Sequence, residues 1–256
     1  MLIDAHLHFQ DIKDERVLAG ILDPAPSAGI GRFLCNGIRP EDWPRVEAIA
    51  YRDERIVPFF GVHPWNGGQV AEGWEVQLEK MLEIHPGAGI GEVGLDRARA
   101  AESFERQKQV FRAQLAMAGR LSRPVAVHCA RAWGELLTAL RAQKPAGLRC
   151  MVHSFNGSAG VLREFLDLGA FISFSWKILR DKSDRVLELV RRVPDDRLLL
   201  ETDFPYTEPG KIGEDADAAK YFRCLHETYA IVAEARETGV EILQKTVWDN
   251  GTSFLH

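Results

Sequence analysis

The sequence predicts an α/β protein of the (β/α)8 or TIM-barrel class, formed by a single domain over residues 1–256. Short apolar runs rich in β-branched and aromatic residues alternate with segments of helical periodicity, a pattern typical of parallel strands joined by helices. Eight such runs are present, and they begin at intervals of roughly 30 residues, the length of one strand–helix unit. A doubly wound open sheet is the alternative architecture.

The expected strands are nearly continuous apolar runs, as in a sheet that is buried on both faces. No low-complexity segment and no internal repeat divides the chain, which favours one domain. In chain order the runs are LIDAHLH (2–8), RFLCNG (32–37), IVPFFGV (56–62), AGIGEVGL (88–95), PVAVHC (124–129), RCMVHSF (149–155), GAFISFS (169–175) and RLLLETD (197–203).

Two connecting segments show the clearest helical pattern. Residues 74–86 carry apolar residues near helical spacing, and a closing proline ends the predicted helix. Residues 102–121 form a longer amphipathic segment with one apolar stripe that would pack on the sheet. The apolar positions are Val76, Leu78, Met81, Leu82 and Ile84 in the first segment, and Phe104, Val110, Phe111, Leu115 and Ala118 in the second.

Composition excludes several classes of protein. The chain is 46% hydrophobic and 27% charged with a formal net charge of −5, which argues against a broadly basic surface that coats nucleic acid. No stretch has the roughly 18 uncharged apolar residues of a membrane span, and the first residues do not form a signal peptide. Four scattered cysteines without CxxC spacing predict no disulfides. We expect a cytoplasmic monomer with no membrane partner.

Two histidines are separated by one residue in the first run, within DAHLH. In a strand, side chains at i and i+2 point to the same face, so His6 and His8 would project together, with Asp4 behind them. Two imidazoles aimed at one point form half of a metal site. The alternative is a pair of strand histidines that hydrogen-bond to the backbone.

Further polar residues recur at the same phase of the other runs, near the ends of the expected strands. In a barrel the C-terminal ends of all strands open onto one face, where active sites are built. Six nitrogen and oxygen donors on that face predict a metal centre. The six are His6, His8, Glu92, His128, His153 and Asp203.

Two divalent cations would make this site locally positive, so that it attracts phosphate although the whole protein is acidic. Such cations lower the pKa of water, supply hydroxide near neutral pH and take up charge on phosphoryl oxygens. Glu92 suits the bridging position because a carboxylate has two oxygens. Asp203 could bind a metal with one oxygen and accept the proton of the nucleophilic water with the other. Nitrogen-rich ligation favours zinc, manganese, iron or nickel over magnesium on affinity, and zinc, manganese and magnesium stay the candidates.

An ordered set of motifs resembles the TatD family of metal-dependent deoxyribonucleases, which are amidohydrolase-like barrel enzymes. The motifs are IDAHLHFQD, GVHPW, GIGEVGLD, PVAVHCARA, VHSFNGS and LLLETDFPY, and they span nearly the whole chain. The resemblance implies a TIM barrel with two divalent cations and phosphodiester hydrolysis, typically removal of nucleotides from DNA ends. It also implies the ligand sets, with His6, His8, Glu92 and Asp203 around one metal and Glu92, His128 and His153 around the other.

Four residues are candidates for substrate binding. His63 matches the family and is expected at the mouth of the site near a phosphate, or else is a turn histidine beside a proline. Trp65 would stack on a base or pack on its neighbours, and Lys177 would neutralise a phosphate oxygen or be solvated. Arg131 departs from the family pattern His-x-Arg-x-Ala, because here the arginine comes one residue later.

Other residues carry weaker expectations. Glu201 either orients a histidine ligand or pairs with an arginine, and Asp96 either ends its strand or supports the site. Cys129 is interpreted as barrel packing. The basic residues from Arg97 to Arg123 are interpreted as a solvated helix face. Two segments depart from the family, DRARA at 96–100 and TEPGKIGEDADAAKYF at 207–222.

Two other functions fit the same ligands. An amidohydrolase-type lactonase or deacetylase would act on a carbonyl with the same metals and strand-eight aspartate. The weaker alternative is an inactive metal-loaded scaffold that binds nucleic acid or protein.

Overall fold

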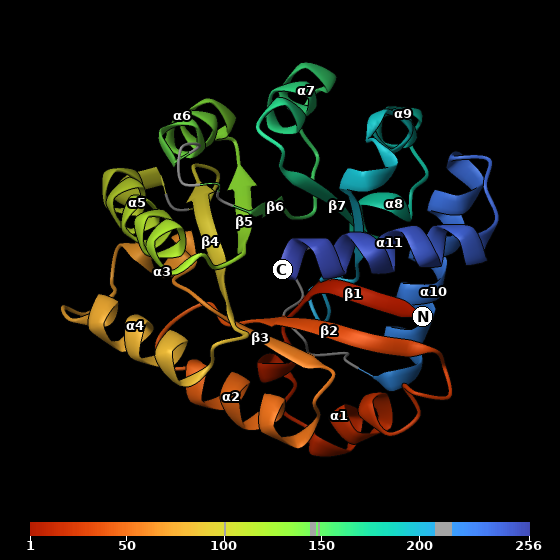
Figure 1. Ribbon diagram of the computed structural model, residues 1–256, viewed down its shortest axis with the longest axis horizontal. Coiled ribbons are helices and arrows are strands. Elements are labelled where there is room, and N and C mark those ends of the chain that lie inside the picture. The colour runs from red at the N-terminus through yellow and green to blue at the C-terminus, as the bar shows by residue number, and fades with distance from the viewer. Residues whose placement is uncertain (100, 144–146, 148, 208–216) are drawn as a thin grey trace.

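The computed structural model describes residues 1–99, 101–143, 147, 149–207 and 217–256, and its strands form one parallel sheet curled into a barrel within a ring of helices (Figure 1). The strands pair in the order β1 to β8, which confirms the TIM-barrel class. A doubly wound sheet is wrong, because its strand order reverses at a switch point. The strands are β1 (Leu2–Leu7), β2 (Ile30–Asn36), β3 (Ile56–Phe60), β4 (Gly89–Asp96), β5 (Val125–Ala130), β6 (Cys150–Val152), β7 (Phe171–Ser175) and β8 (Leu198–Glu201).

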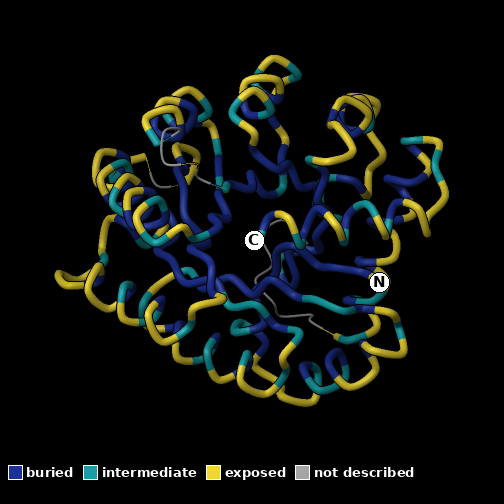
Figure 2. Tube along the Cα trace, in the orientation of Figure 1, coloured by how far each residue is buried: buried dark blue, intermediate teal, exposed yellow. Residues whose placement is uncertain are grey.

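Helices cover the outside of the barrel and expose their outer faces, whereas the strands are almost continuously buried (Figure 2). The helices are α1 (Glu15–Leu22), α2 (Trp43–Arg52), α3 (Pro64–Gly67), α4 (Trp74–Ile84), α5 (Phe104–Leu121), α6 (Trp133–Gln143), α7 (Ala159–Asp167), α8 (Trp176–Leu179), α9 (Asp184–Arg192), α10 (Ala218–Ala235) and α11 (Val240–Leu255), with 3-10 turns η1 (Phe9–Asp11), η2 (Ala101–Ser103) and η4 (Asp195–Arg197).

The two predicted helices are present. In α5 all five predicted apolar positions are buried. In α4 the buried residues are Trp74, Leu78 and Leu82, whereas Val76 and Ile84, two of the apolar positions that predicted the helix, are exposed. The reason is that Trp74 sets the buried stripe at intervals of four residues, which turns Val76 to the opposite side of the helix.

Backbone and side-chain hydrogen bonds join β8 to β1 and complete the barrel. The backbone N–H of Asp203 donates to the His6 carbonyl at 3.0 Å, and that of His8 donates to Phe204 at 2.7 Å. Below them, the Asp4 carboxylate accepts from the Thr202 backbone at 2.9 Å and from its hydroxyl at 2.7 Å. Asp4 therefore fixes the segment that leads into Asp203, and its side chain contacts backbone and a hydroxyl instead of an imidazole.

Helix α11 closes one end of the barrel, with the C-terminus near its centre (Figure 1). A Cβ at Gly251 would lie 2.4 Å from Ile3 Cδ1, so a larger residue there would force the Ile3 side chain to shift as α11 packs on β1. The Phe254 ring packs on Phe59 and Phe171. Because α11 closes the N-terminal ends of the strands, the opposite end is left for a site.

All four cysteines are buried free thiols, as predicted. Within the described ranges, no helix combines the length and the apolar character needed to cross a bilayer.

Candidate active site

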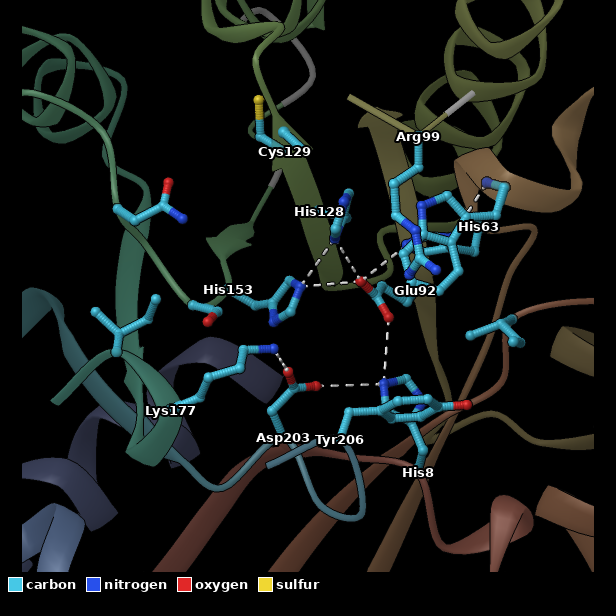
Figure 3. Close-up of a pocket in the computed structure, with 16 residues that line it drawn as sticks. His8, His63, Glu92, Arg99, His128, Cys129, His153, Lys177, Asp203 and Tyr206 are labelled. Atoms are coloured by element: carbon cyan, nitrogen blue, oxygen red, sulfur yellow. Dashed lines mark hydrogen bonds and ion pairs between the residues drawn. The ribbon is translucent and has the colours of Figure 1, made fainter. Parts of the chain in front are cut away.

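Glu92 occupies the centre of a cluster of imidazoles at the C-terminal end of the barrel (Figure 3). Its Oε2 atom lies 3.4 Å from His6 Nε2 and 3.3 Å from His8 Nε2, and these two nitrogens are 3.2 Å apart. As the i, i+2 spacing predicts, the two imidazoles point together, although His8 lies one residue beyond β1.

The second oxygen of Glu92 faces a different set of histidines. Its Oε1 atom lies 2.9 Å from His153 Nε2, 3.0 Å from His128 Nδ1 and 3.3 Å from His63 Nε2. His128 and His153 are themselves 3.3 Å apart. The strand prediction was too long here, since His153 follows the three-residue β6.

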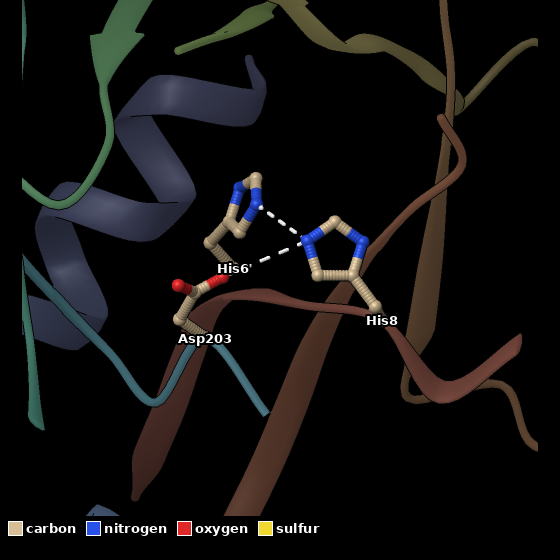
Figure 4. Close-up of side chains that lie close together, drawn as sticks. All are labelled: His6, His8 and Asp203. Atoms are coloured by element: carbon tan, nitrogen blue, oxygen red, sulfur yellow. Dashed lines mark hydrogen bonds and ion pairs between the residues drawn. The ribbon is translucent and has the colours of Figure 1, made fainter. Parts of the chain in front are cut away.

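Asp203 lies next to His8, with 3.6 Å between Oδ1 and Nε2 (Figure 4). Its backbone has a φ of +59°, a left-handed conformation that aspartate tolerates better than most residues. Its other oxygen, Oδ2, is 2.7 Å from Lys177 Nζ. We call His6, His8 and Asp203 the Oε2 side of the site, and His63, His128 and His153 the Oε1 side.

Neighbouring groups fix the orientation of the imidazoles. His8 donates from Nδ1 to the Asn36 carbonyl at 2.7 Å, which leaves Nε2 for the site. His153 Nδ1 lies 3.2 Å from Glu201, so the prediction that Glu201 orients a histidine agrees with the geometry. His128 Nε2 is 3.4 Å from Asp96, whose role as a support for the site also agrees. Such contacts set which ring nitrogen is free to ligate.

A glycine allows β4 and β5 to approach closely beside Glu92. Gly94 has a φ of +145°, and a Cβ there would lie 2.0 Å from the His128 carbonyl oxygen. A larger residue would separate β4 from β5 and move Glu92 away from His128.

Charge on the site favours cations. Burial would raise the pKa of Glu92, but His63, His153 and His128 hold it well below its usual range. In turn, burial would lower the pKa of His153, but Glu92 and Glu201 raise it to about 10. The pocket thus keeps its carboxylate ionised and raises the pKa of three imidazoles, His8, His128 and His153, whereas burial lowers the pKa of His6 and His63. Bound cations would replace the protons of the first three.

The donor spacing also fits metal ions. Ligand distances of about 2.0–2.2 Å place tetrahedral donors roughly 3.3–3.6 Å apart. The 3.2 Å between His6 and His8 and the 3.3 Å between His128 and His153 lie close to the short end of that range. His6, His8 and Asp203 can each present one atom within 4.8 Å of the others, and so can His63, Glu92 and His128. His63 belongs to the second group, but its Nδ1 accepts from the Trp65 backbone N–H, so its Nε2 carries the ring proton and faces Glu92 as a donor, which agrees with its expected place near a phosphate.

A cavity of about 340 Å³ opens above these side chains. Trp65 and Lys177, two of the four candidates for substrate binding, line it. Cys129 lines it too, and burial raises the pKa of its thiol to about 12. Arg131 is exposed and is not among the lining residues, so the structure gives no support to its predicted role. Arg131 comes directly after the last residue of β5 and has a φ of +53°, so it no longer follows the alternation of the strand.

Two lining residues were missed from the sequence. Arg99 was interpreted as part of a solvated helix face, which is wrong, because it lies in the turn after β4 and lines the cavity. Tyr206 lies edge-on to His8, with ring centres 5.1 Å apart, and donates to Asp11 at 2.7 Å. Tyr206 is the last residue of the motif LLLETDFPY, but its spacing from other residues does not predict a place in the site. Most of the divergent segment at 207–222 lies outside the described residues.

Comparisons with known proteins give the family. The family model described as TatD related DNase matches residues 3–256. The metal-dependent hydrolase YabD of Bacillus subtilis is 27% identical over 251 residues, which cover 98% of this chain and 97% of YabD. The Erwinia amylovora protein named 3'-5' ssDNA/RNA exonuclease TatD is 35% identical over 191 residues, 74% of each chain.

A solved structure shows the same architecture. The crystal structure of YjjV, a TatD homologue from Escherichia coli, superimposes with a TM-score of 0.87 at 27% identity and covers 99% of this chain and 97% of that one. Together with the family model, this match confirms the resemblance seen in the sequence. The chain belongs to the TatD-related DNase family of metal-dependent hydrolases.

Proposed function

We propose that this protein is a two-metal phosphodiesterase that removes nucleotides from the end of single-stranded nucleic acid. The observation that carries the proposal is the division of donors about Glu92, whose Oε2 faces two imidazoles and whose Oε1 faces three others. One carboxylate with a separate nitrogen set at each oxygen is suited to bridge two cations. Zinc, manganese and magnesium are the candidates.

Divalent cations bound here would withdraw charge from phosphoryl oxygens and lower the pKa of water. Asp203 would act as the base, since its carboxylate reaches both His8 and the cavity. Burial would raise the pKa of Asp203, but Lys177 and His8 keep it below its usual range, so the carboxylate is ionised and can accept a hydrogen bond from the attacking water. Lys177 would hold Asp203 in place and offer positive charge to the phosphate from the cavity wall.

Nucleic acid is favoured over a carbonyl substrate by the lining and size of the cavity. Trp65 and Tyr206 offer aromatic surface for a base, and Arg99 and Lys177 offer positive charge. A cavity of about 340 Å³ holds one small ligand, near the lower end of the usual range of roughly 300–1,000 Å³. The cavity therefore suits the terminal nucleotide of a nucleic-acid chain, in keeping with the name of the Erwinia relative.

Metal analysis combined with a substrate panel tests this proposal. The protein is loaded with manganese or zinc, dialysed, and assayed on single-stranded DNA, bis-p-nitrophenyl phosphate and a set of lactones, with a chelated sample as control. We expect two equivalents of metal, hydrolysis of both phosphodiesters and no lactone turnover. Carbonyl turnover without phosphodiester turnover would contradict the proposal, and bound metal without any turnover would favour a scaffold.

A further inference from the structure

Arg99 stands at the rim of the cavity with its guanidinium stacked on Trp65. The guanidinium carbon lies 4.1 Å from the centre of the indole ring. The Trp65 ring in turn meets His63 edge-on, with 4.7 Å between ring centres. Arg99 thus extends into the cavity on the side of His63, one aromatic ring beyond the imidazoles of the Oε1 side (Figure 3).

The guanidinium of Arg99 has no carboxylate partner among the residues that the structure describes. Lys177, the other lysine or arginine that lines the cavity, is paired with Asp203. Arg97, two positions earlier, also stacks on an aromatic ring, that of Phe104 at 4.2 Å, but it pairs with Glu135 and does not line the cavity. Arg99 is therefore a positive group that faces the substrate space, stacked on Trp65 and with no acidic partner in the described part of the chain.

One buried carboxylate holds this arrangement. Asp96 accepts from the backbone N–H groups of Ala98 and Arg99 at 2.7 and 2.9 Å, and from the Trp65 indole at 2.5 Å. The same carboxylate lies 3.4 Å from His128. Asp96 therefore ties the position of the Arg99–Trp65 stack to the imidazoles below it, so the stack has a set place relative to the reacting phosphate.

We propose that Arg99, supported by Trp65, binds the phosphodiester that neighbours the one being cleaved. The inference rests on the proposed function and narrows its substrate class to chains with at least two successive phosphodiesters. A planar guanidinium suits the two oxygens of a phosphate. Its place on the rim, beyond the cluster around Glu92, suits the next phosphate along the strand and not the reacting one.

An experiment that removes one phosphate charge at a time tests whether Arg99 binds the neighbouring phosphodiester. The substrates are a thymidine trinucleotide and its two isomers in which one phosphodiester is replaced by an uncharged methylphosphonate, so that one cleavable bond remains. Wild-type, Arg99→Ala and the matched control Arg97→Ala are compared on all three, and on bis-p-nitrophenyl phosphate. For Arg99→Ala we expect kcat/KM on the trinucleotide to fall about 10- to 100-fold, mainly through KM.

On the methylphosphonate isomers, Arg99→Ala should have the same kcat/KM as wild-type, because the phosphate charge that Arg99 would bind is already absent. On bis-p-nitrophenyl phosphate, which has one phosphodiester, its kcat/KM should also equal that of wild-type. Arg97→Ala should behave as wild-type. A binding measurement adds a readout that does not depend on turnover. With a labelled phosphorothioate trinucleotide, followed by fluorescence anisotropy, Arg99→Ala should lower the slope of log Kd against log salt by about 0.7.

Equal losses of Arg99→Ala on the native and the methylphosphonate substrates would overturn the inference, as would an unchanged KM and salt slope. These outcomes are distinct from failure of the proposed function. In that case the wild-type itself would hydrolyse neither the trinucleotide nor bis-p-nitrophenyl phosphate.

Discussion

The two sides of Glu92 are built differently. The Oε2 side joins two imidazoles to a carboxylate, comes from the adjacent strands β1 and β8, and is fixed below by the bonds between Asp4 and Thr202. The Oε1 side is made of imidazoles from the ends of β3, β5 and β6 and borders the Trp65–Arg99 rim. Under the proposed function, Asp203 would accept the proton on the Oε2 side, and the Arg99–Trp65 rim would bind the neighbouring phosphate beside the Oε1 side.

The largest expected effect comes from the group that the two sides share. Glu92→Ala should remove both cations and lower activity by on the order of 1,000-fold or more, because each side loses its bridging oxygen. Glu92→Gln, which keeps one oxygen but no charge, should hold at most one cation. Metal content by mass spectrometry and bis-p-nitrophenyl phosphate turnover measure this. Two retained equivalents of metal in Glu92→Ala would break the proposed bridge.

The next effect separates chemistry from folding on the Oε2 side. Asp203→Asn should lower kcat by about 100- to 10,000-fold, since the amide cannot accept the proton of the nucleophile. Circular dichroism and thermal unfolding should stay as in wild-type. Activity lost only together with the fold would show that Asp203 serves the barrel and not the reaction.

A smaller effect should be confined to the Oε1 side. Glu201→Gln weakens the partner that orients His153, and should lower the affinity of the Oε1-side cation by about 10- to 100-fold, with the Oε2-side cation unchanged. Calorimetric titration with manganese resolves the two sites. Ser173→Ala is the matched control, because it removes the hydroxyl that bonds to Glu201 and leaves the contact with His153. An equal loss at both sites would argue against independent sides.

The smallest effect concerns the support beneath the Oε2 side. Asp4→Asn places an amide NH₂ near the donors of Thr202, and should lower the free energy of unfolding by about 1–3 kcal/mol. Metal content should stay at two equivalents. Urea denaturation of Asp4→Asn, Thr202→Val and the double variant measures the coupling. Loss of metal at unchanged stability would mean that Asp4 serves the cations directly.

Much of the fold follows from local pattern. The apolar runs predicted eight strands because buried parallel strands need apolar residues on both faces. Their ends were less predictable, as at 149–155, where only Cys150–Val152 is strand. There the chain leaves the sheet after Val152, and His153 points to Glu92. The pattern of apolar residues cannot predict that turn.

The cluster of six predicted donors follows from topology, since all strand ends of a barrel meet on one face. His63 shows the limit of that rule. Its Nδ1 accepts from the Trp65 backbone at 3.2 Å, which turns Nε2 toward Glu92, and this contact depends on the local turn. The partnership of Arg99 with Trp65 joins the turn after β4 to the short helix α3, so neither spacing nor periodicity could predict it.

Anomalous diffraction from crystals grown with manganese or zinc tests the central claim most directly. The account predicts two peaks per chain, one on each side of the Glu92 carboxylate, the first beside His6, His8 and Asp203 and the second beside His128 and His153. A single peak, or peaks that Glu92 does not touch, would contradict it.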